Sequence, residues 1–138
     1  MTEQTRRSFL GRLAKGAALG GLLLLPGQPA SAGSAKKGFI HQVYFWLRKP
    51  ENEQDKARLL EGLRMLSKVK TIREYHIGVP AGATRDVVDA SYAISWMLVF
   101  KDKAAQDAYQ VDPIHLKFVE EYSALWSKVV VYDSIAVE

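Results

Sequence analysis

Two segments of this sequence alternate like β-strands yet are apolar at nearly every position. Residues Tyr92–Phe100 contain no acidic or basic side chain, and Phe39–Leu47 contains only one, His41. Because neighbouring side chains of a strand point to opposite faces, both segments present apolar groups on both sides. Strands of this kind are typical of the middle of a sheet that is covered on both faces. The chain must therefore fold around a sheet whose two faces both need a cover.

The other elements follow from hydrophobic periodicity and from residues that begin helices. Asn, Asp and proline at helix starts provide the boundaries, since their side chains satisfy free backbone N–H groups or fit the first turn. We expect a helix from Asn52 to Val69, a strand over Ile72–Val79, a short helix from Asp102 to Tyr109, a helix restarting at Asp112 and continuing to Trp126, and a strand over Val129–Ile135.

This order of elements predicts an α+β fold. Strand, helix, strand, strand, helix, strand is the ferredoxin-like βαββαβ pattern, with a four-stranded antiparallel sheet and two helices on one face. The opposite face is then bare, and a small domain does not leave so large an apolar patch in water. We therefore predict a homodimer in which two sheets face each other, close into an α/β barrel and enclose a cavity that binds a small apolar molecule.

The N-terminal region resembles an export signal. Adjacent arginines in Arg6–Leu10 resemble a twin-arginine motif, and the apolar stretch 16–25 is too short to span a bilayer. Small residues at Ala30 and Ala32 fit a signal peptidase site. The expected organisation is a cleaved signal over 1–32, a linker over 33–37 and one domain over 38–138, placed in the periplasm or outside the cell without stable membrane insertion.

Charge and composition exclude several classes of function. The net charge is +4, but four basic residues and one acidic residue lie within 1–32, so the remainder is almost neutral. Nothing in this balance points to nucleic acid. The absence of cysteine excludes disulfides and thiolate chemistry, and three scattered histidines give no metal-binding spacing, so we predict no metal and no cofactor.

Four short motifs together resemble a known family. They are His41–Phe45 in the first strand, Ile77-Gly78 at the end of the second, the segment Tyr109–Phe118, and Val130–Asp133 in the last strand. In this order and spacing they resemble the stress-responsive dimeric α/β-barrel (Dabb) domain, over about Gly38 to Ile135. The resemblance implies the ferredoxin-like fold and a dimer.

The resemblance also suggests a site. One member of the family, a plant polyketide cyclase, works without a metal or an organic cofactor, and its tyrosine and histidine fall on Tyr109 and His115 here. A further histidine of that enzyme falls on His41. Two of its polar pocket residues are absent, because a third-strand histidine is replaced by Ile94 and a tyrosine of the first helix by Gly62.

The chemistry of these side chains fits proton transfer. A neutral imidazole at His115 can accept a proton, and the phenol of Tyr109 can donate a hydrogen bond to a carbonyl that becomes an enolate. His41 or Asp133 could orient the histidine. The apolar residues expected to line the pocket are Val43, Phe45, Ile94 and Trp96.

Structural roles for the same residues stay open at this point. His115 can cap a helix or contact a dimer partner, Tyr109 can pack with its hydroxyl satisfied, and His41 can be a hydrogen-bonded core histidine. Asp133 can serve a hydrogen bond at a strand end. The leading function is a small-molecule binding barrel that acts as a cofactor-free lyase or cyclase. The alternatives are a haem-binding or oxygenase-like barrel and a non-catalytic stress or scaffold dimer.

Overall fold

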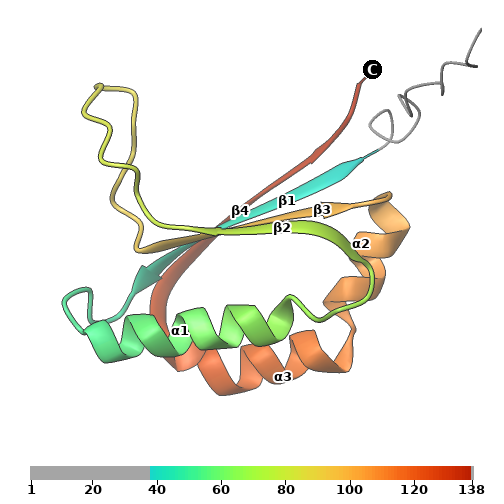
Figure 1. Ribbon diagram of the computed structural model, residues 1–138, viewed down its shortest axis with the longest axis horizontal. Coiled ribbons are helices and arrows are strands. Elements are labelled where there is room, and N and C mark those ends of the chain that lie inside the picture. Colours follow the sequence, from blue (N-terminus) through green and yellow to red (C-terminus); the bar gives the residue numbers. More distant parts are fainter. Residues whose placement is uncertain (1–37, 138) are drawn as a thin grey trace, which may run out of the picture. The chain divides into compact units, whose positions relative to one another are not determined.

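The computed structural model describes residues 38–137. The expected signal (1–32) and linker (33–37) lie outside the described residues. Figure 1 shows the described part as one sheet with its helices. In chain order the elements are β1 (Phe39–Leu47), α1 (Glu53–Leu66), β2 (Ile72–Gly78), β3 (Ile94–Phe100), α2 (Lys103–Gln110), α3 (Pro113–Tyr122), the 3-10 turn η2 (Ser123–Leu125) and β4 (Trp126–Ile135).

The topology is the predicted ferredoxin-like one. The strand order is β2-β3-β1-β4, and each neighbouring pair is antiparallel. The two apolar strands identified in the sequence, β1 and β3, lie at the centre, as expected for strands without polar faces. Helices α1 and α3 lie on the same face of the sheet (Figure 1).

The second helical region is divided into two helices by its cap residues. The Asp102 carboxylate accepts a hydrogen bond from the backbone N–H of Ala105, and the Asp112 carboxylate accepts one from Ile114. Each satisfies a donor that the first turn leaves free. In the described part of the chain the sheet is therefore accompanied by three α-helices rather than two, and the break between α2 and α3 lies at Val111 and Asp112.

Element boundaries differ from the sequence expectation at two strands. β3 begins at Ile94 rather than Tyr92, and the Tyr92 ring, which precedes the strand, packs against that of Tyr44 with centroids 4.8 Å apart. β4 begins at Trp126 rather than Val129, since α3 already ends at Tyr122 and the 3-10 turn delivers the chain to the sheet edge. Apolar periodicity in the sequence did not mark either boundary.

The core lies between the sheet and the helices. Every second residue of β1 and β3 points toward the helices and is buried, as are the inward-facing leucines of α1. Leu59 and Leu63 have no exposed surface, and burying one such side chain stabilises the fold by about 1.5–3 kcal/mol. The inward residues of the two strands are Phe39, His41, Val43, Phe45, Leu47, Ile94, Trp96, Leu98 and Phe100.

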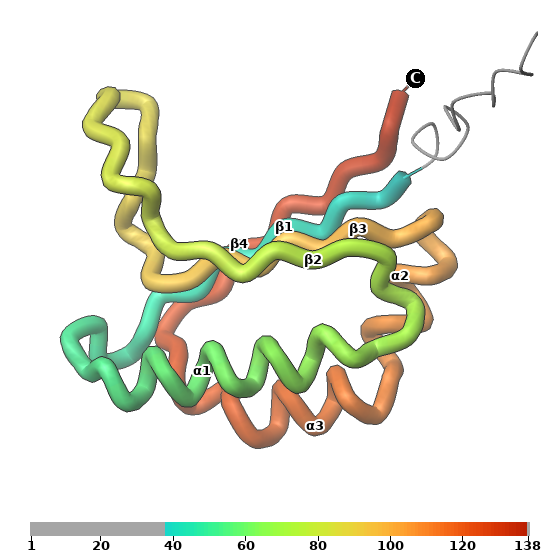
Figure 2. The backbone as a smooth tube through the Cα atoms, viewed as in Figure 1, coloured from blue at the N-terminus to red at the C-terminus, as the bar shows by residue number. Residues whose placement is uncertain are grey.

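The opposite sheet face has no helix over it in the described part of the chain. Ile40 is 39% exposed and Tyr132 is 65% exposed there. The long loop between β2 and β3 rises on this side, away from α1 and α3 (Figure 2). Within residues 38–137, no helix has the length and apolar character needed to cross a membrane.

Candidate functional site

A small cavity lies between the sheet and the helices, around Tyr109 and His115. Its volume is about 140 Å³. Residues from β1, α1, β3, α2, α3 and β4 contribute to it, so distant parts of the sequence meet there. The lining residues are His41, Val43, Phe45, Leu66, Trp96, Tyr109, Gln110, His115, Phe118, Val119, Trp126, Val129 and Val131.

The predicted site residues Tyr109, His115 and His41 thus meet on the helix side of the sheet, and not in the cavity between two facing sheets where they were expected. His41, Val43 and Trp96 point to the helix-covered face, so one chain supplies all the residues around this cavity. The alternation of β1 could not reveal this, because both of its faces are apolar and a period of two does not say which face the helices cover.

Tyr109 lies at the centre of the polar groups. Its side chain is only 1% exposed, and its ring centroid lies 4.6 Å from that of His115 and 5.8 Å from that of His41. The indole N–H of Trp96 points at the Tyr109 hydroxyl oxygen over 3.4 Å. Burial raises the pKa of Tyr109 well above its ordinary value, against a smaller opposing effect of the Trp96 hydrogen bond. The phenol therefore stays protonated and is a hydrogen-bond donor.

His115 lies in the first turn of α3, where the Asp112-Pro113 break brings it back toward α2. Its Nδ1 lies 3.0 Å from the carbonyl oxygen of Gln110. Because a carbonyl only accepts, Nδ1 carries the hydrogen, and Nε2 is the nitrogen that can take up a proton. Burial lowers the pKa of His115, against a smaller opposing effect of the Gln110 hydrogen bond. The imidazole is therefore neutral near pH 7.

His41 and Asp133 form a pair across β1 and β4. The two residues are register partners, and His41 Nδ1 lies 2.6 Å from a carboxylate oxygen of Asp133. The carboxylate can only accept, so the imidazole donates. His41 is 5% exposed, whereas the Asp133 side chain is 43% exposed. The carboxylate thus orients His41, not His115, and Asp133 itself is not among the residues that line the cavity.

Three of the four predicted pocket residues line the cavity. Val43, Phe45 and Trp96 do so, but Ile94, the fully buried register partner of Phe45 at the start of β3, does not. The sequence analysis named His115 on α3 but missed the apolar lining that α3 and β4 contribute. Periodicity in α3 marked Phe118 and Val119 only as apolar positions, which gives no sign that they face a void.

The space around Gly62 is filled by other side chains. The resemblance places a tyrosine of the plant cyclase at this position of the first helix. A Cβ atom at Gly62 would lie 2.9 Å from the ring of Tyr122 and 3.0 Å from that of Phe118. Those two rings stack with centroids 5.4 Å apart. Aromatic side chains from α3 therefore fill the space beside α1, and α1 has no room for a polar group there.

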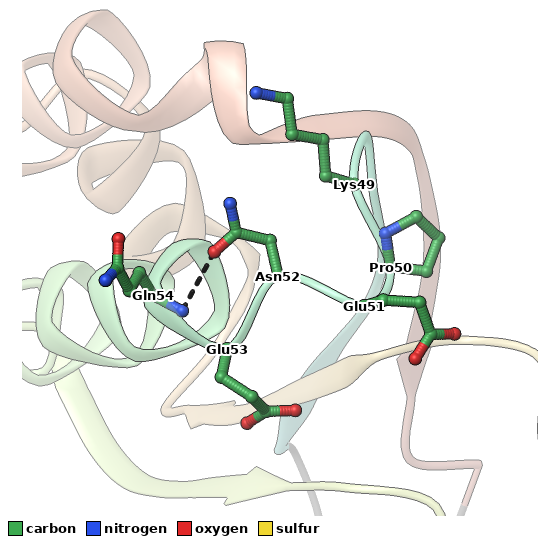
Figure 3. Close-up of a pocket in the computed structure, with 6 residues that line it drawn as sticks. All are labelled: Lys49, Pro50, Glu51, Asn52, Glu53 and Gln54. Atoms are coloured by element: carbon green, nitrogen blue, oxygen red, sulfur yellow. Dashed lines mark hydrogen bonds between the residues drawn. The ribbon is translucent and has the colours of Figure 1, made fainter.

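A larger hollow, of about 670 Å³, lies at the start of α1 and has no comparable chemistry. It is lined only by consecutive residues of one loop, 49–54 (Figure 3). The side-chain oxygen of Asn52 is occupied there, since it accepts hydrogen bonds from the N–H groups of Gln54 and Asp55. This surface is a helix cap. Among residues 38–137, no cluster of His, Cys, Asp or Glu could hold a metal ion.

Comparison with known proteins agrees with this architecture. A Dabb protein from Mesorhizobium loti with a ferredoxin-like fold is 20% identical, with a TM-score of 0.62 over 74% of this chain and 99% of that one. The hydroxynitrile lyase of Passiflora edulis is 16% identical, with a TM-score of 0.64 over 75% and 96% of the two chains. A dimeric ferredoxin-like protein from Jannaschia sp. CCS1 is 24% identical, with a TM-score of 0.57 over 70% and 97%.

The sequence itself points to one family. No curated protein matches this chain. Residues 39–136, however, match the family described as Stress responsive A/B Barrel Domain, or Dabb. That match begins with β1 and ends just beyond β4, so it covers every strand and helix described above. The chain belongs to the stress-responsive A/B barrel domain (Dabb) family.

Proposed function

We propose that the protein binds a small, mainly apolar carbonyl compound in the Tyr109–His115 cavity and moves a proton at the carbon next to the carbonyl. Such a step underlies cofactor-free lyase and cyclase reactions. The observation that carries the proposal is the close pairing of a protonated phenol with a neutral imidazole, whose ring centroids lie 4.6 Å apart in a mainly apolar cavity.

The two side chains have complementary roles in this proposal. His115 accepts the proton at Nε2, because Nδ1–H is held by the Gln110 carbonyl. Tyr109 donates its O–H to the substrate carbonyl and stabilises the enolate oxygen, because its own oxygen already faces the Trp96 N–H. The apolar walls strengthen both interactions by keeping the local dielectric low.

The cavity volume limits the substrate. An apolar cavity of about 150 Å³ holds one benzene molecule, so about 140 Å³ suits a group of that size. Three valines, Val119, Val129 and Val131, line the cavity and are also each more than a third exposed to solvent. They therefore form the part of the wall that lies nearest the surface. A longer substrate could therefore extend past these valines to the surface.

The cavity volume gives less support to a haem-binding or oxygenase-like barrel and to a non-catalytic stress or scaffold dimer. Cofactor sites usually enclose about 300–1,000 Å³, which makes this cavity small for haem. A purely structural dimer would be expected to fill the cavity with side chains, as most protein interiors are filled. A similar fold is found in a lyase, the Passiflora edulis hydroxynitrile lyase, which favours the catalytic proposal.

Hydrogen–deuterium exchange at a ketone tests the proton transfer without knowledge of the natural substrate. Acetophenone and cyclohexanone are incubated with the protein in D2O, and loss of their α-proton signals is followed by NMR. We expect faster exchange with the unmodified protein, and a decrease of about 100-fold or more for Tyr109→Phe and for His115→Gln. Tyr75→Phe and His76→Gln, both exposed on β2, serve as matched controls.

The result can also refute the proposal. Exchange that persists unchanged in both Tyr109→Phe and His115→Gln would show that these side chains do not move the proton. Failure of both ketones to bind or to exchange would remove the carbonyl assignment.

We further propose a homodimer formed through the helix-free sheet face. The exposure of Ile40 and the dimeric protein of similar fold from Jannaschia sp. CCS1 support this arrangement. Analytical ultracentrifugation should give twice the chain mass at micromolar concentration, and Ile40→Glu should yield monomers because it places a charge in the interface. A stable wild-type monomer would contradict the proposal.

We also propose export by the twin-arginine route, supported by the Arg6–Leu10 motif and the short apolar stretch after it. Cell fractionation should recover a shortened chain in the periplasm, and replacing both Arg6 and Arg7 with lysine should retain it in the cytoplasm. Equal export of this variant would refute the route.

A further inference from the structure

Exposed apolar side chains continue the cavity of the candidate site to the surface. Val119 of α3 and Val129 and Val131 of β4 line the cavity and are also exposed. Leu116, which is 56% exposed, lies one turn before Val119, because residues three apart are neighbours on a helix. We call these four residues the apolar strip. Single exposed apolar residues are ordinary, but a group that adjoins a cavity is typical of a ligand-binding groove.

The register of the sheet fixes the direction of the two β4 valines. Val131 pairs with Val43 and Val129 pairs with Phe45, and both of these β1 residues are buried beneath the helices. Partners in an antiparallel pair have their side chains on the same face of the sheet. The two β4 valines therefore lie on the helix side. The proposed dimer interface is on the opposite face, so a partner bound there does not cover the apolar strip.

The strand order explains why this side of the cavity is open. β4 is the last strand of the sheet, beyond β1, so residues 38–137 place no further strand beside it. On its other side α3 packs against α1, where the rings of Phe118 and Tyr122 meet Gly62. Val119 follows Phe118 on α3 and lines the cavity together with the β4 valines. The cavity therefore reaches the surface between α3 and β4.

The size of the cavity determines which part of a substrate it holds. A volume of about 140 Å³ suits a group of about the size of benzene. In the proposed proton transfer, the carbonyl group and the carbon next to it must lie beside Tyr109 and His115. These atoms take up much of the cavity. A longer chain must leave past the exposed valines, and the apolar strip is the surface that it then contacts.

We propose that the apolar strip binds the alkyl chain of the substrate, which is a neutral ketone with an unbranched chain longer than the cavity. The inference rests on the proposed function, since it takes the carbonyl group to lie beside Tyr109 and His115. Each methylene group that leaves water for an apolar surface adds a similar increment to the binding free energy. The affinity of the protein for ketones therefore rises with chain length.

The test compares 2-butanone, 2-hexanone and 2-octanone. NMR titration measures the dissociation constant from the indole N–H signal of Trp126, which lines the cavity. Exchange of the α-protons in D2O is followed separately. Full burial of a methylene group would raise the affinity about fourfold, and we expect about twofold because the strip covers only one side of the chain. Equal affinities for 2-butanone and 2-octanone would overturn the proposal.

Two variants locate the alkyl chain. Val131→Thr keeps the branched shape but adds a hydroxyl, and Leu116→Gln replaces an exposed apolar side chain with a polar one on the same helix. Each should reduce the preference for 2-octanone over 2-butanone about threefold. Val79→Thr and Glu121→Gln are the matched controls, because both residues are exposed and neither lines the cavity. They should leave the preference unchanged.

The outcomes separate this proposal from the proton transfer. A chain-length preference that persists undiminished in Val131→Thr and Leu116→Gln would place the alkyl chain elsewhere and refute the assignment. A preference that depends on these two residues, without α-proton exchange for any of the three ketones, would support the apolar strip and refute the proton transfer alone.

Discussion

Removing the carboxylate of Asp133 should destabilise the domain through His41. His41 is 5% exposed, and its Nδ1–H points at Asp133 over 2.6 Å. In Asp133→Ala this buried donor loses its acceptor, which costs about 1–3 kcal/mol. Because the Asp133 side chain is 43% exposed, water can partly take its place, so we expect the lower half of that range. Asp133→Asn keeps an acceptor oxygen and should cost less than Asp133→Ala.

The control is another aspartate, Asp107, which forms an ion pair at the surface. Lys103 and Asp107 lie 2.7 Å apart with side chains 71% and 57% exposed. Such an i,i+4 pair contributes only about 0.3–0.5 kcal/mol. Asp107→Ala should therefore have a much smaller effect than Asp133→Ala.

Urea unfolding followed by tryptophan fluorescence distinguishes Asp133→Ala from Asp107→Ala. With an m-value of about 2 kcal/mol/M, a loss of about 1–2 kcal/mol moves the midpoint by roughly 0.5–1 M. If Asp133→Ala and Asp107→Ala shift the midpoint equally, or if Asp133→Asn is as damaging as Asp133→Ala, the buried hydrogen bond is not what Asp133 contributes.

Three further predictions concern single residues. The pKa of His115, measured in an NMR pH series, should lie below its ordinary value of 6.5. The unfolded chain then binds this proton more readily than the folded chain, so the free energy of unfolding should fall as the pH drops below about 6.5. This fall should be smaller in His115→Gln. A titration midpoint above 6.5 would contradict the burial effect. Gly62→Ala should destabilise by about 1–2 kcal/mol in urea unfolding despite its better helix propensity, because the new methyl group meets the Tyr122 ring at 2.9 Å; a stabilised variant would show that the ring moves freely. Leu63→Ala should cost about 2–5 kcal/mol by the same assay, since this residue has no exposed surface, and a loss below 1 kcal/mol would contradict its place in the core.

The sequence predicted the architecture well because its strongest signals are local. Alternation in Phe39–Leu47 and the cap residues Asn52, Asp102 and Asp112 depend only on neighbours along the chain, and the structure confirms them. The position of β1 at the centre of the sheet followed from its lack of a polar face.

The details of the site could be predicted only in part. The sequence could propose Tyr109, His115 and His41 as candidates, and the structure brings all three to one cavity. It could not show that Asp133 pairs with His41, because that contact depends on the register of β1 against β4. Nor could it show that the cavity lies on the helix side, because two apolar faces of one strand look alike.

The carbonyl 13C signal of acetophenone labelled at its carbonyl carbon tests the central claim most directly, because it reports the hydrogen bond from Tyr109 to the ligand. In the presence of excess protein we expect this signal to move downfield from its position in buffer, as hydrogen-bond donation polarises the carbonyl, and to return most of the way in Tyr109→Phe. A bound ligand whose signal is the same with the unmodified protein and with Tyr109→Phe would contradict the account.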